Sequence, residues 1–156
     1  MSVLAVGPEP FDGPDVQALL DALADELDER YGGDDPTYRT EVSAAQFAPP
    51  GGRFLVGRVG GEAVACGGVR RLEPGVGEIK RMYVRPDHRG RGLSRPLLAA
   101  LEDAARDLGY ATVRLETGEP QHEAVRLYES SGYHRIRPYG RYAWSPVNLC
   151  FEKAVG

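Results

Sequence analysis

The chain has 156 residues, of which 42% are apolar, and a net charge of −4. This length and composition predict a single domain, residues 1–156, that buries its own core. Its apolar runs are too short to span a membrane, and MSVLAVGPEP lacks the basic start and long apolar centre of a secretory signal. We therefore expect a cytoplasmic protein without a membrane partner.

The charge is unevenly distributed along the chain. Residues 1–62 hold 12 acidic and 4 basic side chains, whereas residues 63–156 hold 11 acidic and 15 basic ones. Within the second part, residues 80–95 contain six bases and one acid. This pattern favours a local anion site on an acidic protein over a general nucleic-acid surface.

The first elements in chain order are a short strand at 2–7 and an amphipathic helix. The sequence from 31 to 52 is rich in Gly, Pro and Asp, which predicts a long loop with at most one short helix near 41–47. The helix is predicted from apolar residues at steps of three and four: Val16, Leu19, Leu20, Leu23 and Leu27.

Three strands are predicted next, at 53–59, 62–72 and 77–85. The glycine pair at 60–61 is a tight-turn signal between the first two, so these strands should form an antiparallel meander. An amphipathic helix is then expected to start at Ser94, to tolerate Pro96 in its first turn and to stop at Gly109.

The last part predicts a strand at 110–118, a helix from Pro120 to Gly132, and two strands at 133–140 and 147–153. Hairpin strands interrupted by two crossover helices imply an α/β (α+β) domain. We expect a mixed sheet with helices on both faces. Its strands at 78–85 and 111–116 should be parallel neighbours, because a helix connects them.

The turn before the second long helix has the properties of an anion site. A helix that follows a strand and a glycine-containing turn points its first unpaired N–H groups at one spot, and its dipole attracts negative charge. Gly90 and Gly92 let a ligand approach the backbone, while Arg89, Arg91 and Arg95 supply donors that suit phosphate. A pyrophosphate would fit there, although neither a Walker motif nor a dinucleotide fingerprint is present.

Two segments resemble the GNAT superfamily of N-acetyltransferases. EIKRMYVRPDHRGRGLSRPLL is similar to its acetyl-CoA-binding motif, [RQ]-x-x-G-x-[GA], and EAVRLYESSGY resembles its C-terminal A-x-x-L-Y-x-x-x-G-[FY] segment. The resemblance covers residues 53–153 and implies a mostly antiparallel sheet that splays open between its fourth and fifth strands. It also implies that the chain transfers an acetyl group from acetyl-CoA to a primary amine.

The resemblance places the defining motif positions at Arg89, Gly92 and Ser94, where Ser94 replaces the usual Gly or Ala. The Met82 N–H would hold the thioester carbonyl, and Gln121 stands where many members have an Asn that contacts the pantetheine arm. The implied cofactor-binding residues are Met82, Tyr83, Val84, Arg89, Gly90, Arg91, Gly92, Leu93, Ser94, Arg95 and Gln121.

Acetyl transfer needs a deprotonated amine, a stabilised oxyanion and a proton for the leaving thiolate. By the same resemblance, Glu78 falls where histone-acetylating members keep their general base. Tyr128 matches the tyrosine that hydrogen-bonds the CoA sulfur and acts as general acid. Packing alone could also explain Tyr128, and Glu78 could be a solvated strand residue.

The cysteines and histidines point to no further chemistry. Cys66 and Cys150 lie far apart in apolar stretches, so we expect two buried thiols. His88, His122 and His134 show no metal-ligand spacing, and we expect surface histidines and no metal site.

The acceptor is the least defined part of the prediction. In the family, the acceptor site is lined by segments that correspond to residues 14–47 and 138–146 of this chain. Asp34, Asp35 and Glu41 make the first segment acidic, which favours a cationic small amine or a peptide amino group. In the second segment, Tyr139, Tyr142 and Trp144 fit either an aromatic wall or the packing of a final hairpin.

Two other functions stay open at this point. One is a non-catalytic acyl-CoA-binding module that uses the arginine turn alone. The other is a nucleic-acid binder that uses Lys80, Arg81, Arg85 and the same turn. A homodimer is compatible with the sequence.

Overall fold

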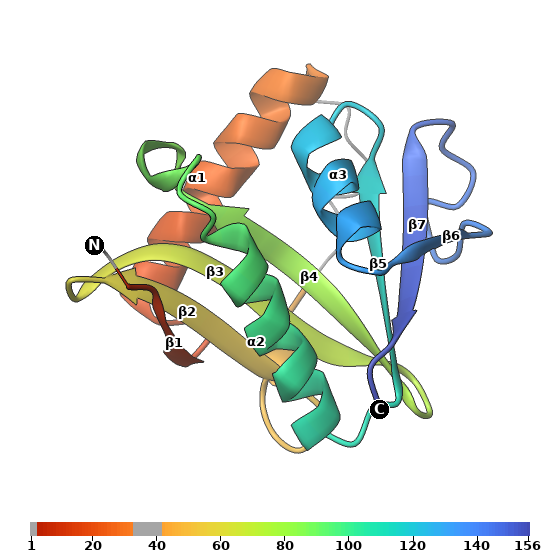
Figure 1. Ribbon diagram of the computed structural model, residues 1–156, viewed down its shortest axis with the longest axis horizontal. Coiled ribbons are helices and arrows are strands. Elements are labelled where there is room, and N and C mark those ends of the chain that lie inside the picture. The colour runs from red at the N-terminus through yellow and green to blue at the C-terminus, as the bar shows by residue number, and fades with distance from the viewer. Residues whose placement is uncertain (1–2, 33–41) are drawn as a thin grey trace.

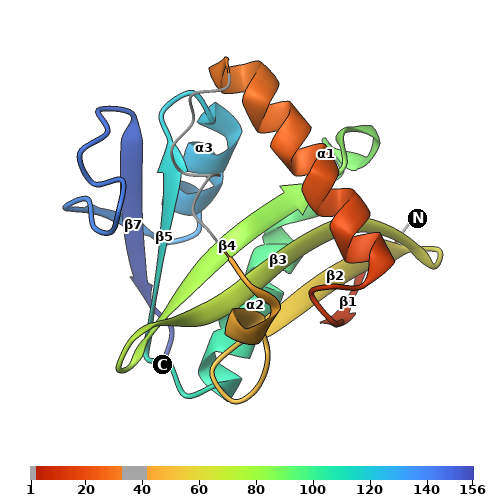
Figure 2. The ribbon, with the colours of Figure 1, turned by 180° about the vertical axis from the view of Figure 1, so that it is seen from behind.

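The structure, a computed structural model, describes residues 3–32 and 42–156. A seven-stranded sheet lies between helices on both of its faces (Figures 1 and 2). The strands are β1 (Ala5–Pro8), β2 (Arg53–Val59), β3 (Glu62–Glu73), β4 (Val76–Val84), β5 (Thr112–Gly118), β6 (His134–Ile136) and β7 (Asn148–Ala154). The helices are α1 (Pro14–Tyr31), α2 (Ser94–Asp107) and α3 (His122–Ser130), with 3₁₀ turns η1 (Ala44–Phe47) and η2 (Pro86–His88).

The sheet order is β1-β2-β3-β4-β5-β7-β6. All neighbouring strands are antiparallel except β4 and β5, which run parallel as predicted. β4 and β5 pair only over Val76–Glu78, and beyond that point the two strands diverge (Figure 1). The predicted opening between the fourth and fifth strands is therefore confirmed, and we call it the fork.

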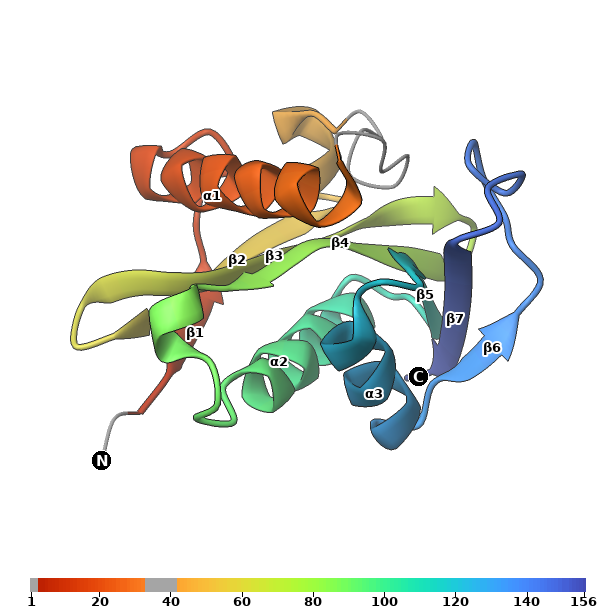
Figure 3. The ribbon, with the colours of Figure 1, turned by 90° about the horizontal axis from the view of Figure 1, so that it is seen from above.

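Each face of the sheet has its own core. Seen from above, α1 covers one face and α2 and α3 cover the other (Figure 3). The α1 side packs Val16, Leu19, Leu23 and Leu27 against the sheet and η1, as the helical spacing predicts. On the opposite side, α2 presents a set of buried residues that comprises Leu97, Leu98, Leu101, Ala104 and Ala105.

Two glycines in β3 allow this close packing. A Cβ on Gly67 would lie 2.8 Å from Leu101 of α2, and a Cβ on Gly68 would lie 2.6 Å from the ring of Phe47 in η1. Because consecutive strand residues face opposite sides, the pair brings both cores close to the same stretch of β3. This explains why β3 is buried from Val64 to Val69.

Several predicted boundaries are wrong in detail. β1 covers 5–8 rather than 2–7, and β6 ends at Ile136 because Pro138 cannot donate to a ladder. Pro120 belongs to the turn before α3, whose first residue is His122. By contrast, α2 starts at Ser94 as predicted, with Leu93 at its cap position.

Both cysteines are free and buried, as expected. Burial raises the pKa of Cys66 from its usual 9.0 to about 12. Among the described residues no helix is long and apolar enough to cross a membrane. The acidic residues Asp34, Asp35 and Glu41 lie outside the described part of the chain.

Candidate acetyl-CoA cleft and fork cavity

A bulge in β4 marks the start of the site. Cys66 faces Tyr83 and Gly68 faces Lys80, so both Arg81 and Met82 lie opposite Gly67. Arg81 has a φ of 59°, a left-handed conformation that is uncommon for a residue with a side chain. A bulge interrupts the ladder between two strands and bends the bulged strand. Here the bulge lies beyond Glu78, where β4 no longer pairs with β5.

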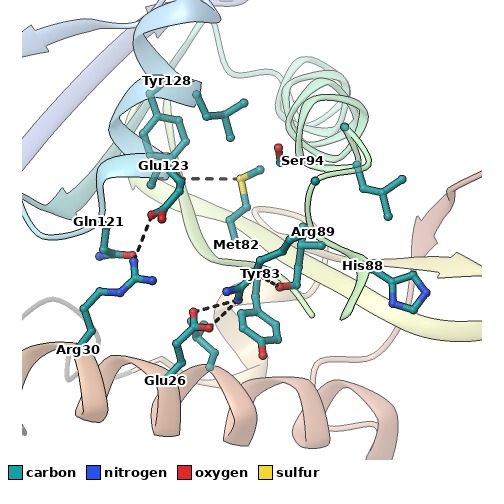
Figure 4. Close-up of a pocket in the computed structure, with 17 residues that line it drawn as sticks. Glu26, Arg30, Met82, Tyr83, His88, Arg89, Ser94, Gln121, Glu123 and Tyr128 are labelled. Atoms are coloured by element: carbon teal, nitrogen blue, oxygen red, sulfur yellow. Dashed lines mark hydrogen bonds and ion pairs between the residues drawn. The ribbon is translucent and has the colours of Figure 1, made fainter. Parts of the chain in front are cut away.

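A cleft of about 290 Å³ lies beside this end of β4. It is bounded by α1, by the turn that joins β4 to α2, and by α3 (Figure 4). Of the predicted cofactor residues, those that line it are Met82, Tyr83, Val84, Arg89, Gly90, Gly92, Leu93, Ser94 and Gln121. Arg91 and Arg95 do not line it; Arg95 instead donates to the hydroxyls of Ser130 and Ser131 at the end of α3.

The glycine turn leaves room for a ligand. Gly90 has a φ of 76° and Gly92 a φ of 73°, values that side chains rarely adopt. A Cβ at either position would meet nothing within 4 Å, so the backbone is open to the cleft. The turn leads into the first turn of α2, whose N–H groups and dipole favour an anion. These features fit the pyrophosphate of CoA.

The arginines contribute less free charge than the sequence indicates. Arg89 donates through Nε to the Val84 carbonyl (2.8 Å) and pairs through Nη2 with Glu26 of α1 (2.7 Å). On the other side of the cleft, Arg30 of α1 pairs with Glu123 of α3 at 3.5 Å (Figure 4). α1 is thus linked to both walls of the cleft. Sequence reasoning missed Glu26, Arg30 and Glu123, because only the fold places α1 beside them.

Tyr128 points its hydroxyl into the cleft. Its side chain is buried, and the only hydrogen-bond partner of its Oη in the described chain is the Met82 sulfur at 4.0 Å, a weak acceptor (Figure 4). Burial raises the pKa of Tyr128 to about 12, so the phenol keeps its proton at neutral pH. This is the state that a general acid for a thiolate requires.

Glu78 is buried in an ion pair rather than solvated. Its Oε1 accepts from Arg70 Nε at 3.0 Å, and its Oε2 accepts from the Tyr139 hydroxyl at 2.7 Å. Arg70 also donates to Gln46 of η1. Glu78 does not line the cleft, and it does not line the smaller cavity between β4 and β5 that is described next. Its role as base therefore stays a prediction.

A second cavity of about 70 Å³ lies at the fork, and we call it the fork cavity. It shares Leu23, Met82, Gln121 and Tyr128 with the cleft, so the two spaces meet beside Met82, where the resemblance places the thioester. The buried ion pair of Lys80 and Glu116 lines it. In the sequence, Lys80 belongs to a basic segment, and no local pattern singles out Glu116. Their proximity depends on the register of β4 against β5.

The remaining predicted residues are placed as follows. Tyr139 contacts Glu78, Tyr142 lies under the guanidinium of Arg141, and Trp144 is 74% exposed. His88 lines the cleft and is half-buried, whereas His122 and His134 are exposed. No metal-ligating cluster occurs within residues 3–32 and 42–156.

Comparisons with known proteins agree with this geometry. A model of the "Acetyltransferase (GNAT) family" matches residues 19–133. An IAA acetyltransferase of Azospirillum brasilense is 39% identical over 145 residues, which cover 90% of this chain and 93% of that protein.

Two solved structures share the fold. A Klebsiella pneumoniae protein assigned as an acyl-CoA N-acyltransferase superposes with a TM-score of 0.82 at 34% identity and covers 99% of both chains. The PaiA N-acetyltransferase of Thermoplasma acidophilum, solved in complex with coenzyme A, superposes with a TM-score of 0.73. It is 13% identical, and the match covers 97% of this chain and 99% of that one.

Proposed function

Because this chain belongs to the GNAT family of acetyltransferases, and is therefore an acyltransferase, we propose that it transfers the acetyl group of acetyl-CoA to a primary amine of a small molecule or peptide. The observation that carries the proposal is the junction of the two cavities. There the donor cleft, the β4 bulge and the Tyr128 hydroxyl meet a separate space that an acceptor can enter.

The CoA moiety would lie in the cleft. Its pyrophosphate would accept from the backbone of residues 89–95 and from the first turn of α2. The pantetheine arm would follow the β5-facing edge of β4 at Met82, Tyr83 and Val84. Because Arg89 is already paired with Glu26, we assign the phosphate contacts mainly to backbone N–H groups.

The reaction we propose is direct transfer. The amine nitrogen attacks the thioester carbonyl carbon, a C–N bond forms, and the oxyanion accepts from the Met82 N–H. As the C–S bond breaks, Tyr128 gives its proton to the CoA thiolate. The proton that the amine loses passes through water to Glu78, the residue proposed as base.

The experiment is a coupled assay of the purified protein with acetyl-CoA and a panel of amines, amino acids and peptides. Free CoA thiol and acetylated product should appear together in equal amounts. Glu78→Gln and Tyr128→Phe should each lower turnover at least tenfold while CoA binding is retained. If CoA binds but no amine of the panel releases thiol, a non-catalytic acyl-CoA-binding module would be the better account. If both variants keep the turnover of the wild type, the roles assigned to Glu78 and Tyr128 are wrong.

The nucleic-acid alternative receives no specific support from the structure. Lys80 is buried against Glu116, and Arg85 is paired with Glu62 and Asp87. Two of the three bases that this alternative would use outside the turn are thus engaged in ion pairs.

A further inference from the structure

The fork cavity contains a buried ion pair that the proposed chemistry does not use. Lys80 and Glu116 lie two residues beyond Glu78 and Arg114, the last paired residues of β4 and β5. Lys80 Nζ donates to Glu116 Oε1 at 3.2 Å, and the two side chains are only 4% and 6% exposed. On its other oxygen Glu116 accepts from Asn148 Nδ2 at 3.3 Å.

Two hydrogen-bond donors that line this cavity, Lys80 Nζ and the Thr117 hydroxyl, have donor capacity that the described residues do not use. An ammonium carries three N–H groups, yet Glu116 is the only acceptor that Lys80 Nζ contacts among the described residues. Thr117, which is 4% exposed, also lines the cavity, and its hydroxyl makes no hydrogen bond to any of the described residues. Buried polar groups are normally satisfied by protein, water or ligand, so this pair of donors is available to an acceptor group of a ligand that enters the cavity.

The charge balance of the pair restricts that ligand. Lys80 and Glu116 balance each other and are nearly shielded from water, and Arg81, the third charged residue that lines the cavity, adds positive charge. A purely cationic amine would therefore bring an uncompensated charge into the cavity. A zwitterion would not, because its carboxylate can face Lys80 while its ammonium faces Glu116. Burial already lowers the pKa of Lys80, and a second carboxylate beside it would favour its charged form.

The spacing also restricts the ligand. With Nζ and Oε1 only 3.2 Å apart, the two charges of the ligand must lie close together. An amine and a carboxylate on the same carbon meet this requirement. The cavity, at about 70 Å³, has room for such a head group, and its opening toward Tyr128 and Met82 would direct the nitrogen to the thioester.

We propose that the acceptor is an α-amino acid, whose carboxylate is held by Lys80 and Thr117 and whose amine is held by Glu116. This inference rests on the proposed acetyl transfer and narrows its substrate class. It makes Lys80 a specificity-determining residue rather than a catalytic one.

The first test uses the wild-type chain alone. Release of CoA thiol is measured with the common α-amino acids, with their α-carboxamides and with the corresponding decarboxylated amines. For the preferred side chain, we expect kcat/KM for the acid to exceed that for its amide and its decarboxylated amine at least tenfold, since each lacks the carboxylate.

The second test substitutes the residues of the fork cavity that are proposed to bind the acceptor. Lys80→Met should reduce the ratio of acid to amide turnover at least tenfold, and Lys80→Met combined with Glu116→Gln should do the same without leaving an unpaired buried charge. Lys153→Met is the matched control. It removes a lysine from another Lys–Glu pair, with Glu102 at 3.1 Å, that lines neither cavity, so the ratio should not change.

The outcomes separate the two levels of the proposal. If decarboxylated amines are acetylated as well as the acids, or if acids are inactive while other amines release thiol, the amino-acid inference is wrong and acetyl transfer stands. If no amine releases thiol although CoA binds, the proposed function itself fails. An unchanged acid-to-amide ratio in both Lys80 variants, with melting curves that show folded protein, would also overturn the inference.

Discussion

Tyr128 is the residue whose surroundings most directly fit a chemical role. Its ring packs against Tyr133 and Phe151 in the core, and its hydroxyl faces the cleft with only a weak contact to the Met82 sulfur. Removal of this oxygen therefore changes little packing and leaves no strong hydrogen-bond partner unsatisfied. A loss of activity in such a variant would report on chemistry rather than on folding.

We expect Tyr128→Phe to lower kcat roughly 100-fold, the typical contribution of a positioned general acid, with the Kd for CoA unchanged. Thiol-release kinetics and calorimetry measure the two quantities. Tyr133→Phe is the matched control: it deletes a buried hydrogen bond to Glu102 of 2.8 Å, so it should lower stability by about 1–2 kcal/mol without reducing kcat. Full activity of Tyr128→Phe would rule out the acid role.

Cys66 makes stability depend on alkaline pH. Its thiol ionises near pH 9.0 in the unfolded chain, but only near pH 12 in the fold, where burial disfavours the thiolate. Above pH 9 the unfolded chain therefore binds fewer protons than the native one, and the free energy of unfolding should fall as pH rises toward 12. Urea titrations from pH 8 upward should show a shallower fall for Cys66→Ala than for the wild type; parallel curves would contradict this assignment.

At the scale of elements, Glu78 connects three segments that are distant in the sequence. Arg70 of β3 links it to Gln46 of η1, and Tyr139 links it to the connection between β6 and β7. The carboxylate thus ties together segments that lie within the two walls expected for an acceptor. These contacts of Glu78 involve residues that are distant in the sequence, so no local sequence pattern predicts them.

Arg70→Met should cost about 3 kcal/mol of stability, because it leaves the buried Glu78 carboxylate without its cation. Arg53→Met provides the comparison, since Arg53 pairs with Asp107 at 3.4 Å in an exposed setting. That change should cost less than about 1 kcal/mol. Urea unfolding of both variants checks the difference, and equal losses would mean that the Glu78 pair contributes no more than a surface contact.

Gly68 sets how closely η1 and β2 approach β3. A Cβ there would lie 2.6 Å from Phe47 and 2.7 Å from Phe54, both within the α1-side core. Gly68→Ala should therefore destabilise the fold by about 2 kcal/mol through overpacking. Gly7→Ala, in β1, meets nothing within 4 Å and should leave the melting temperature nearly unchanged. A Gly68→Ala melting curve that matches the wild type would contradict the packing described here.

At the scale of the whole molecule, the sequence predicts the order of elements and the parallel pair at the fork. Helical spacing identifies the buried face of α1, and the glycine turn with the following helix predicts an anion site beside the cleft. These features are local or repeat at short intervals, so they can be recognised in the amino-acid sequence alone. The short β6 was overestimated because the effect of Pro138 on pairing depends on its place in the sheet.

The contacts that build the site could not be predicted in the same way. Glu26 and Arg89 are 63 residues apart, and Lys80 and Glu116 are 36 apart. Each contact exists only after α1 crosses the sheet or after β5 lines up beside β4. The sequence therefore overestimates how many bases of residues 80–95 are unpaired, because the acids that pair with them lie elsewhere in the chain.

The most direct test of the central claim is a crystal structure of the protein with CoA. We expect the pyrophosphate against the backbone of residues 89–95, and the CoA sulfur within hydrogen-bonding distance of the Tyr128 hydroxyl. A pyrophosphate bound away from that turn, or a sulfur on the far side of the sheet from Tyr128, would contradict the account.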